Sequence, residues 1–532
     1  MKNKAIQICG TGSGVGKSVI TAGLCRIFLQ DGYKVSPFKA QNMALNSFVT
    51  KGGGEIGRAQ AVQAQAARIE PTVEMNPVLI KPSSDTGAQI IVLGKPLNNM
   101  EAVQYIKYKS KLINIVRKSF DKLIEKYKIV VIEGAGSPAE INLKSHDFVN
   151  MKMAEYAKAP VILVCDIDKG GALAWVVGTL ELLTKKERNR VKGIIINKFR
   201  GDINLLTPGI KFLEKRTGIK VLGVIPYFRD VRIPEEDSVP LEIVASRQSL
   251  VASEALTGDE LRATSYEIRT TNDYKLDIAV IYLPHISNFT DFDPLEKEPD
   301  VLLRYIRSPE ELGSPDIIII PGTKNTIGDL KYLKDSGLAH KILFTIHDSR
   351  FTVLIGICGG YQMLGRKIFD KHSLESNCKK IEGLGILPVE TSLEKEKILR
   401  QVKGKELISG RKIYGYEIHH GCAKIIGKYS PFFEISERDG KKAKYFDGIV
   451  SKNKQIFGTY LHGIFDDDSF RRDFLNRVRL KKGWTVLSQT TNFNVDKEFD
   501  KLANIVRENI DINYLYKIMK HPSVIPAKAG IQ

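Results

Sequence analysis

Short, nearly continuous apolar runs alternate with longer segments of mixed polarity through the first part of the chain. Runs this apolar, separated by segments long enough to form helices, indicate parallel strands that are covered on both faces. The sequence therefore predicts a first α/β domain over residues 1–245. The runs lie at 4–9, 33–38, 128–133, 159–166, 192–197 and 220–226.

The same alternation returns after a polar, Ser/Thr-rich stretch at 246–275, which we interpret as a linker. It predicts a second α/β domain over residues 276–485, again a mainly parallel sheet flanked by helices. Residues 486–532 include an amphipathic stretch, which predicts a terminal helix packed on the second domain and then a tail. The apolar runs of this half lie at 276–283, 315–322, 351–358 and 455–463.

Length and composition agree with two globular domains. The chain has 532 residues, whereas a single core usually organises no more than about 250–300. No apolar run reaches the roughly 18 residues of a membrane span, and no secretory signal is visible, so we expect a cytoplasmic protein without a membrane partner. The six cysteines lack CxxC spacing, which leaves reduced thiols available for chemistry.

A formal net charge of +19 attracts polyanions, which include ATP, polycarboxylates and nucleic acids. The Lys and Arg residues are spread along the chain rather than clustered, and this favours a lysine-rich solvated surface over a nucleic-acid site. We therefore expect no nucleic-acid partner. The sequence leaves the oligomeric state open.

The segment ICGTGSGVGKSVITAG at 8–23 has the order strand, Gly-rich turn, helix that is typical of a phosphate-binding loop. Its glycines let backbone N–H groups surround a phosphate, its lysine reaches the outer phosphates, and its serine hydroxyl can bind Mg²⁺. One position departs from the usual pattern, because Thr11 stands six residues before the lysine and Gly10 comes one step earlier. The predicted nucleotide ligands are Gly12, Gly14, Gly16, Lys17 and Ser18.

Other polar residues at strand ends extend this predicted ATP site. Glu133 ends an apolar run and precedes Gly-Ala-Gly, which places its carboxylate where Mg²⁺ would bridge phosphates. Glu55 is a second candidate metal ligand, although it could equally cap a helix. Lys39 is a candidate phosphate or carboxylate clamp, with a surface lysine as the alternative. Asn197 is a candidate for reading adenine, with a turn-forming role nearly as plausible.

A second kind of chemistry is indicated by Cys358 in VLIGICGGYQMLG and His462 in FGTYLHGIF. A thiol between an apolar strand and a Gly-Gly turn lies at a helix N-terminus, which favours the thiolate, and a histidine at another strand end can take its proton. The N–H of Gly359 is a predicted oxyanion donor, and the second is predicted from the loop at 321–326, at Gly322. This arrangement is typical of acyl transfer through a thioester.

The residue that orients the imidazole is not evident. Many amidotransferases carry a Glu two residues after the histidine, and here that position is Ile464. Glu417 in YGYEIHHG is a possible substitute, although it could equally hold substrate or lie in a turn.

With these motifs assembled, the cysteine half resembles a type 1 glutamine amidotransferase domain, and the front half resembles the dethiobiotin-synthetase-like ATP-binding domain. From about residue 4 to residue 485 the chain is similar to the glutamine-hydrolysing adenosylcobyric acid synthase family, whose members also lack the Glu after the histidine. The segments that carry this resemblance are PFKAQNMALNS (37–47), EIGRAQAVQAQAA (55–67), CDIDKGGALA (165–174), INKFRGD (196–202), LPHISNFTDFDPL (283–295) and YGYEIHHG (414–421).

The resemblance implies ATP- and Mg²⁺-dependent amidation of the b, d, e and g carboxylates of adenosylcobyrinic acid a,c-diamide, with glutamine as the nitrogen donor. Two alternatives stay open at this point. Cobyrinate a,c-diamide synthase uses the same two kinds of domain on an earlier corrinoid, and a P-loop partition-type ATPase would bind DNA and carry a degenerate cysteine domain.

Overall fold

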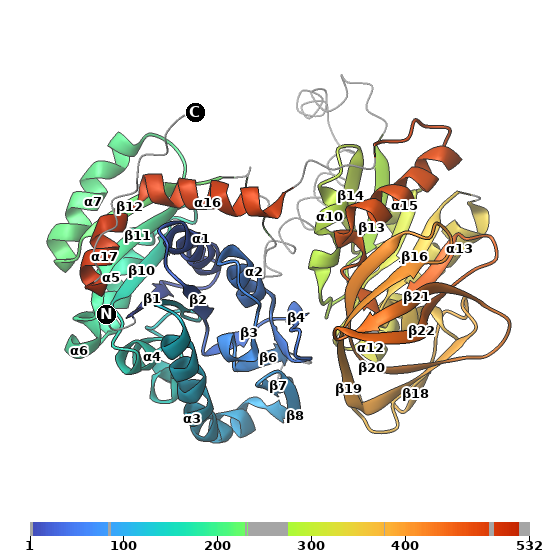
Figure 1. The fold of residues 1–532 in the computed structure, drawn as a ribbon, viewed down its shortest axis with the longest axis horizontal. Coiled ribbons are helices and arrows are strands. Elements are labelled where there is room, and N and C mark those ends of the chain that lie inside the picture. The colour runs from blue at the N-terminus through green and yellow to red at the C-terminus, as the bar shows by residue number, and fades with distance from the viewer. Residues whose placement is uncertain are drawn as a thin grey trace.

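The computed structural model describes residues 4–82, 87–228, 231, 233, 275–349, 351–376, 378–488 and 494–520. The described chain forms two lobes that lie side by side, the first coloured blue to green and the second yellow to orange in Figure 1. Two mainly parallel sheets flanked by helices confirm the predicted fold class. The predicted linker at 246–275 lies outside the described residues apart from Lys275, and the domain boundaries stay predictions.

The first lobe is built on a six-stranded sheet in the order β12-β11-β10-β1-β9-β2, and every pairing in it is parallel. Strands β9 and β10 are buried along their whole length, as expected for a sheet covered on both faces. The six predicted runs form these strands: β1 (Lys4–Gly10), β2 (Val35–Phe38), β9 (Ile129–Glu133), β10 (Val161–Asp166), β11 (Val191–Phe199) and β12 (Val221–Pro226).

Helices cover both faces of this sheet. They are α1 (Lys17–Gln30), α2 (Arg58–Ala66), α3 (Ala102–Lys126), α4 (Met151–Tyr156), α5 (Ala172–Leu182), α6 (Lys185–Arg188) and α7 (Ile203–Thr217), with short 3₁₀ turns η1 (Val73–Met75) and η2 (Ile141–His146). Within the described ranges, no helix has both the length and the apolar character needed to cross a bilayer.

Two small sheets lie on the side of the first lobe that faces the second (Figure 1). One has the order β3-β6-β7-β8 and the other pairs β4 with β5 in antiparallel fashion. Their strands are β3 (Gln41–Met43), β4 (Ser47–Val49), β5 (Glu55–Gly57), β6 (Val78–Pro82), β7 (Gly87–Val92) and β8 (Lys95–Glu101).

The second lobe combines a parallel core with an antiparallel extension that the sequence did not predict. The parallel part runs β14-β13-β15-β16-β23, and the sheet continues through β22, β21 and β19. The strands are β13 (Leu276–Ile281), β14 (Val301–Ile306), β15 (Ile317–Ile320), β16 (Val353–Ile357), β17 (Lys367–Phe369), β18 (Lys380–Glu382), β19 (Val389–Glu406), β20 (Lys412–Ile425), β21 (Ser430–Arg438), β22 (Lys441–Val450), β23 (Ile456–Thr459) and β24 (Leu461–His462).

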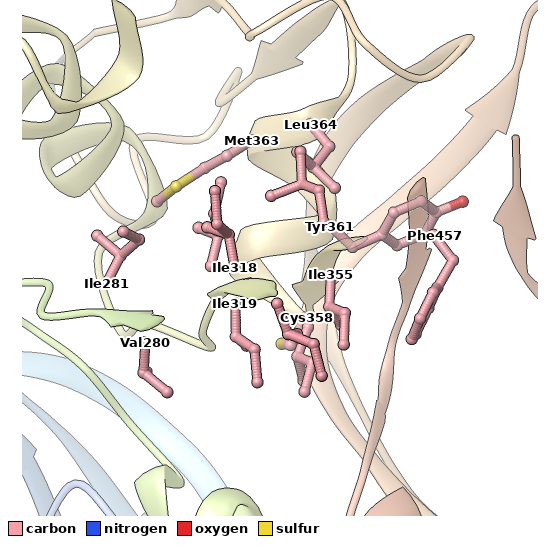
Figure 2. Packing of buried hydrophobic residues seen from close by; sticks show 14 of the residues in the cluster. Val280, Ile281, Ile318, Ile319, Ile355, Cys358, Tyr361, Met363, Leu364 and Phe457 are labelled. Carbon is pink, nitrogen blue, oxygen red and sulfur yellow. The ribbon is translucent and has the colours of Figure 1, made fainter. Parts of the chain in front are cut away.

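The helices of the second lobe pack on this sheet around a large apolar core. Figure 2 shows part of that core, with isoleucines of β15 and β16 beside Cys358 and the side chains that follow it. The helical segments are η4 (Phe289–Phe292), α10 (Asp293–Glu296), α11 (Pro309–Leu312), α12 (Thr326–Asp335), α13 (Leu338–Asp348), α14 (Gly359–Leu364), η5 (Ile464–Asp466) and α15 (Asp468–Lys481).

The C-terminal helices α16 (Val495–Asn509) and α17 (Ile512–Met519) pack on the first lobe, so the prediction that they pack on the second domain is wrong. Figure 1 shows α16 lying along α1. Its apolar face, which includes Leu502 and Val506, joins the core formed by β1 and α1. Buried Arg26 of α1 pairs with Asp500 of α16 at 2.7 Å. Amphipathicity predicted the helix, but it could not predict which apolar surface the helix would cover.

We expect Leu502→Ala to destabilise the first lobe by about 2–5 kcal/mol, because a fully buried leucine is replaced by a cavity. The measurement is denaturant unfolding with two separate readouts: loss of nucleotide binding, which reports on the first lobe, and loss of glutamine hydrolysis, which reports on the second. Asn504→Ala on the exposed side of the same helix is the matched control and should change the unfolding free energy little. Equal destabilisation by both variants would contradict the packing of α16 on the first lobe.

Candidate active site

The Gly-rich turn between β1 and α1 has the backbone conformation of a phosphate-binding loop. Gly14 and Gly16 adopt positive φ angles of 68° and 98°, which favour glycine. Close packing requires a glycine at position 10, since a Cβ at Gly10 would lie 2.6 Å from the Val15 side chain. Lys17 Nζ donates to Gly12 O at 2.7 Å, so the ammonium group lies over the loop where phosphate oxygens would bind.

Side chains from β11 brace this loop from one side. Asn197 Nδ2 donates to Val15 O at 2.9 Å, and Lys198 Nζ donates to Gly14 O at 2.7 Å. Lys198 also pairs with buried Asp166 at the end of β10, at 2.9 Å. The sequence singled out Asn197 but not Lys198 or Asp166. The hydrogen bond to Val15 gives Asn197 a structural role that needs no bound nucleotide. A contact between Asn197 and adenine stays a prediction.

Glu133, at the end of β9, joins the loop to the rest of the first lobe. Ser18 Oγ and Lys39 Nζ each donate to Glu133 Oε1 at 2.8 Å, and Gln63 Nε2 donates to Oε2 at 2.6 Å. Burial opposes ionisation of this carboxyl, but the Lys39 charge and these hydrogen bonds hold its pKa below the ordinary value. A hydroxyl and an ionised carboxylate side by side are the hard oxygen donors that fit Mg²⁺.

Glu55 is not part of this cluster. Its carboxylate is fully buried, with Lys81 Nζ at 3.0 Å on one oxygen and Lys397 Nζ at 2.6 Å on the other. Burial opposes its ionisation, yet the charges of Lys397 and Lys81 hold the pKa of Glu55 below its ordinary value. Two ammonium groups would repel a metal ion here, so we leave Glu55 out of the proposed Mg²⁺ site. Because Lys397 belongs to the second lobe, Glu55 joins the two domains.

Cys358 lies at a strained turn between β16 and α14, with φ 52° and ψ −104°. The two glycines that follow are required by close packing, because a Cβ at Gly359 would lie 2.7 Å from Thr323 Cγ2 and one at Gly360 would lie 1.9 Å from Ile320 O. The thiol is thereby held just beyond the carboxyl end of β16, beside the apolar side chains that Figure 2 shows. This is the position that the strand and Gly-Gly pattern predicted.

His462 completes the nucleophilic pair, and Asp291 orients it. His462 is buried on β24 and interacts with Cys358, which contributes to the raised pKa of the imidazole. Its Nδ1 lies 2.6 Å from Asp291 Oδ2, and the N–H of Gly463 donates to Asp291 Oδ1 at 3.0 Å. Burial alone would lower the pKa of His462, but Asp291 and Cys358 raise it to about 10. The site therefore favours the imidazolium form of His462, whose positive charge stabilises a thiolate at Cys358, the form that attacks as a nucleophile.

Glu417 does not orient the imidazole, which was one of the three roles that the sequence left open for it. It accepts a hydrogen bond from Tyr445 at 3.1 Å, on the antiparallel extension of the sheet. Ile464, at the position where many amidotransferases have Glu, is buried in the apolar core. The orienting carboxylate instead comes from η4, on the loop that follows β13. A search for acids after every strand that ends at this sheet edge would have found Asp291.

The loop at 321–323 lies against both reacting side chains. A Cβ at Gly322 would lie 2.9 Å from His462 Cε1 and 3.7 Å from Cys358 Cβ. The N–H of Gly359 stands in the first turn of α14, where helix N–H groups have no partner within the helix. The Gly322 loop thus lies beside both reacting side chains, and the role of the Gly359 and Gly322 N–H groups as oxyanion donors stays a prediction.

A cavity next to Cys358 is lined by charged residues from both lobes, among them Lys81, Lys324, Glu375 and Lys397. Burial raises the pKa of Glu375 to about 7 and lowers that of Lys324 to about 7. Glu375 accepts from the backbone N–H of Thr326 at 2.6 Å, which fixes it beside the cavity. An acidic and a basic group near a thiol suit a ligand that carries both an ammonium and a carboxylate.

We expect Asp291→Asn to lower kcat/KM for glutamine hydrolysis by about 100-fold or more, since the histidine loses its orienting and charge-stabilising partner. Without Asp291, the effect of burial dominates and the pKa of His462 falls from its raised value of about 10. The alkaline limb of the pH–rate profile should then move to lower pH. Glu417→Gln is the control, and a larger shift from it than from Asp291→Asn would contradict the assignment.

Comparisons with known proteins agree with this two-lobe arrangement. Residues 6–241 match the model of the CobQ/CobB/MinD/ParA nucleotide binding domain, and residues 277–470 match the CobB/CobQ-like glutamine amidotransferase domain. A solved structure titled "Crystal structure of glutamine amidotransferase" aligns with a TM-score of 0.29 at 14% identity, over 38% of this chain and 97% of that one, and we draw nothing from so low a likeness.

Curated relatives match nearly the whole chain. A cobyric acid synthase of Caldanaerobacter subterraneus subsp. tengcongensis is 49% identical over 97% of this chain and 98% of its own length. One from Desulfitobacterium hafniense is 50% identical over 97% of each chain. One from Clostridium novyi is 47% identical over 98% of each chain. By this full-length similarity, the chain belongs to the cobyric acid synthase family.

Proposed function

We propose that this protein amidates the b, d, e and g carboxylates of adenosylcobyrinic acid a,c-diamide, with glutamine as nitrogen donor and ATP as activating substrate. The observation that carries the proposal is the joining of two sites in one molecule: a Cys358–His462–Asp291 triad in one lobe and a phosphate loop in the other. The relatives' names supply the substrate class.

In the glutamine site, the Cys358 thiolate attacks the side-chain amide carbon of glutamine, and the oxyanion is held by backbone N–H groups of Gly359 and the 321–323 loop. The C–N bond then breaks as His462 gives its proton to the leaving ammonia. Water, deprotonated by the same imidazole, hydrolyses the glutamyl thioester and releases glutamate. Glu375 and Lys324 are placed to hold the ammonium and carboxylate of the amino acid.

In the first lobe, a substrate carboxylate attacks the γ-phosphorus of ATP and gives an acyl phosphate and ADP. Activation is needed because a carboxylate repels nucleophiles at neutral pH. Ammonia then attacks the acyl carbon and releases phosphate, which leaves the amide. Lys17 and the loop N–H groups hold the phosphates, while Ser18 and Glu133 would hold Mg²⁺, which neutralises phosphate charge when bound.

The alternatives from the sequence are less well supported. A DNA-binding ATPase has no use for the orienting contact between Asp291 and His462 at 2.6 Å. Relatives that match this chain along nearly their whole length carry the name cobyric acid synthase, which does not favour cobyrinate a,c-diamide synthase. Supplying each corrinoid separately and counting the new amides by mass spectrometry would distinguish the two ligases.

We expect Cys358→Ser to lose glutamine-driven amidation while retaining amidation driven by ammonium salts, because the acyl phosphate forms in the other lobe. The measurement is the number of amides formed on the corrinoid with each nitrogen source.

The reciprocal variant, Lys17→Ala, should lose synthesis from both nitrogen sources and still release some glutamate from glutamine. If Cys358→Ser lost both activities equally while remaining folded, the division of labour between the lobes would be refuted.

A further inference from the structure

The two lobes exchange a reciprocal pair of hydrogen bonds next to the triad. The backbone N–H of Phe289 donates to Asn46 Oδ1 at 3.1 Å, and the backbone N–H of Ser47 donates to Asn288 Oδ1 at 3.0 Å. Both asparagines are buried, at 0% and 2% exposure, so neither bond competes with water. Each side chain acts as the acceptor for a backbone of the opposite domain, and the two bonds together fix one register between the lobes.

This contact bears directly on Asp291. Asn288 adopts a left-handed conformation, with φ 54° and ψ 36°, and begins the 3₁₀ turn η4. Its backbone carbonyl accepts from the N–H of Asp291 at 3.0 Å. The carboxylate that orients His462 is therefore carried on a single short turn whose first residue is held by the first lobe.

On the other side of the interface, the same contact leads to the ATP site through α2. The N–H of Arg58, the first residue of α2, donates to the carbonyl of Asn46 at 3.2 Å. Two and five residues later in the same helix, Gln60 and Gln63 donate to Glu133, at 3.4 and 2.6 Å. Gln63 also reaches the carbonyl of Ser18 at 3.3 Å. A helix of only nine residues thus spans from the proposed Mg²⁺ ligands to the domain interface.

Charge strengthens the link. The buried guanidinium of Arg58 lies 5.7 Å from the centroid of the Phe48 ring and interacts electrostatically with Asp291 and Asp466. A shift of α2 therefore moves both a hydrogen-bonded backbone and a positive charge relative to the orienting carboxylate.

We propose that Asn46 and Asn288 are positioning residues for the glutamine triad, and that through α2 they make the Asp291–His462 pair respond to ligands bound at Ser18 and Glu133. Ser18 and Glu133 would hold Mg²⁺ with ATP, and a ligand there would compete for the hydrogen bonds that Glu133 makes with Ser18, Lys39 and Gln63. Glutamine hydrolysis then becomes faster when the activating substrate is present, which limits the loss of ammonia. This inference rests on the proposed function.

The test compares Asn288→Gly with Asn288→Asp in the full-length protein. Glycine keeps the left-handed backbone but removes the acceptor, whereas aspartate tolerates that conformation and keeps an acceptor oxygen. Glutamate release is measured with and without Mg-ATP, as kcat and KM for glutamine. In the wild type, Mg-ATP should raise kcat/KM by about five-fold or more, a usual size for coupling between sites.

Asn288→Gly should lower kcat by about ten-fold, the effect of one lost hydrogen bond, with little change in KM, and should abolish the response to Mg-ATP. Asn288→Asp should restore both. Gln401→Met is the matched control, because Gln401 Nε2 makes another hydrogen bond across the interface, to Val49 O at 2.7 Å, that lies off this path. The control should keep the response to Mg-ATP.

The outcomes separate this inference from the proposed function. A folded wild type that releases no glutamate under any condition overturns the proposed function. A wild type that hydrolyses glutamine without responding to Mg-ATP overturns the coupling alone. A normal response of glutamine hydrolysis to Mg-ATP in Asn288→Gly also overturns the coupling, and so does loss of that response in Gln401→Met. Melting temperatures show whether any variant has simply unfolded.

Discussion

Two asparagine side chains, each accepting a backbone N–H from the opposite lobe, hold the geometry on which glutamine chemistry depends. Asn46 and Asn288 make this exchange in a buried environment, where an unsatisfied amide would cost about 1–3 kcal/mol. The constraint matters because the third member of the triad, Asp291, has no strand or long helix to fix it. It lies on a 3₁₀ turn of four residues that the interface holds in place.

Charged groups at the same interface make the docking of the lobes specific. Glu55 lies between Lys81 and Lys397, all three buried, and removing Glu55 would leave two buried ammonium groups without this counter-charge. The buried apolar cluster that spans the interface in the described residues is small and consists of Val49, Leu399, Tyr416 and Ile418. A small apolar contact surrounded by directional polar groups allows one relative orientation of the lobes. A larger, purely apolar interface would specify that orientation less precisely, because apolar contacts are not directional. The cavity beside Cys358 opens onto this charged region.

Much of this architecture follows from local pattern. The apolar runs predicted both parallel sheets, and the glycines next to Cys358 predicted a close-packed turn, because these features depend on neighbours in sequence. Asp291 was missed because its partner His462 is 171 positions away, and the segment that contains it was noted only for its resemblance to a family. The pairing of Glu55 with Lys397 and the packing of α16 on the first lobe escaped prediction for the same reason. The two segments that carry the family resemblance most clearly, 37–47 and 283–295, contact each other across the interface.

Asn46, a residue of the ATP-binding lobe, acts on glutamine through Asp291 rather than directly. A double-mutant cycle on glutamine hydrolysis, with Asn46→Ala and Asp291→Asn alone and combined, tests this claim most directly. If Asn46 works by positioning Asp291, the Asn46→Ala change should have almost no further effect on kcat/KM once Asp291 has been replaced. Additive losses in the double variant would contradict the claim.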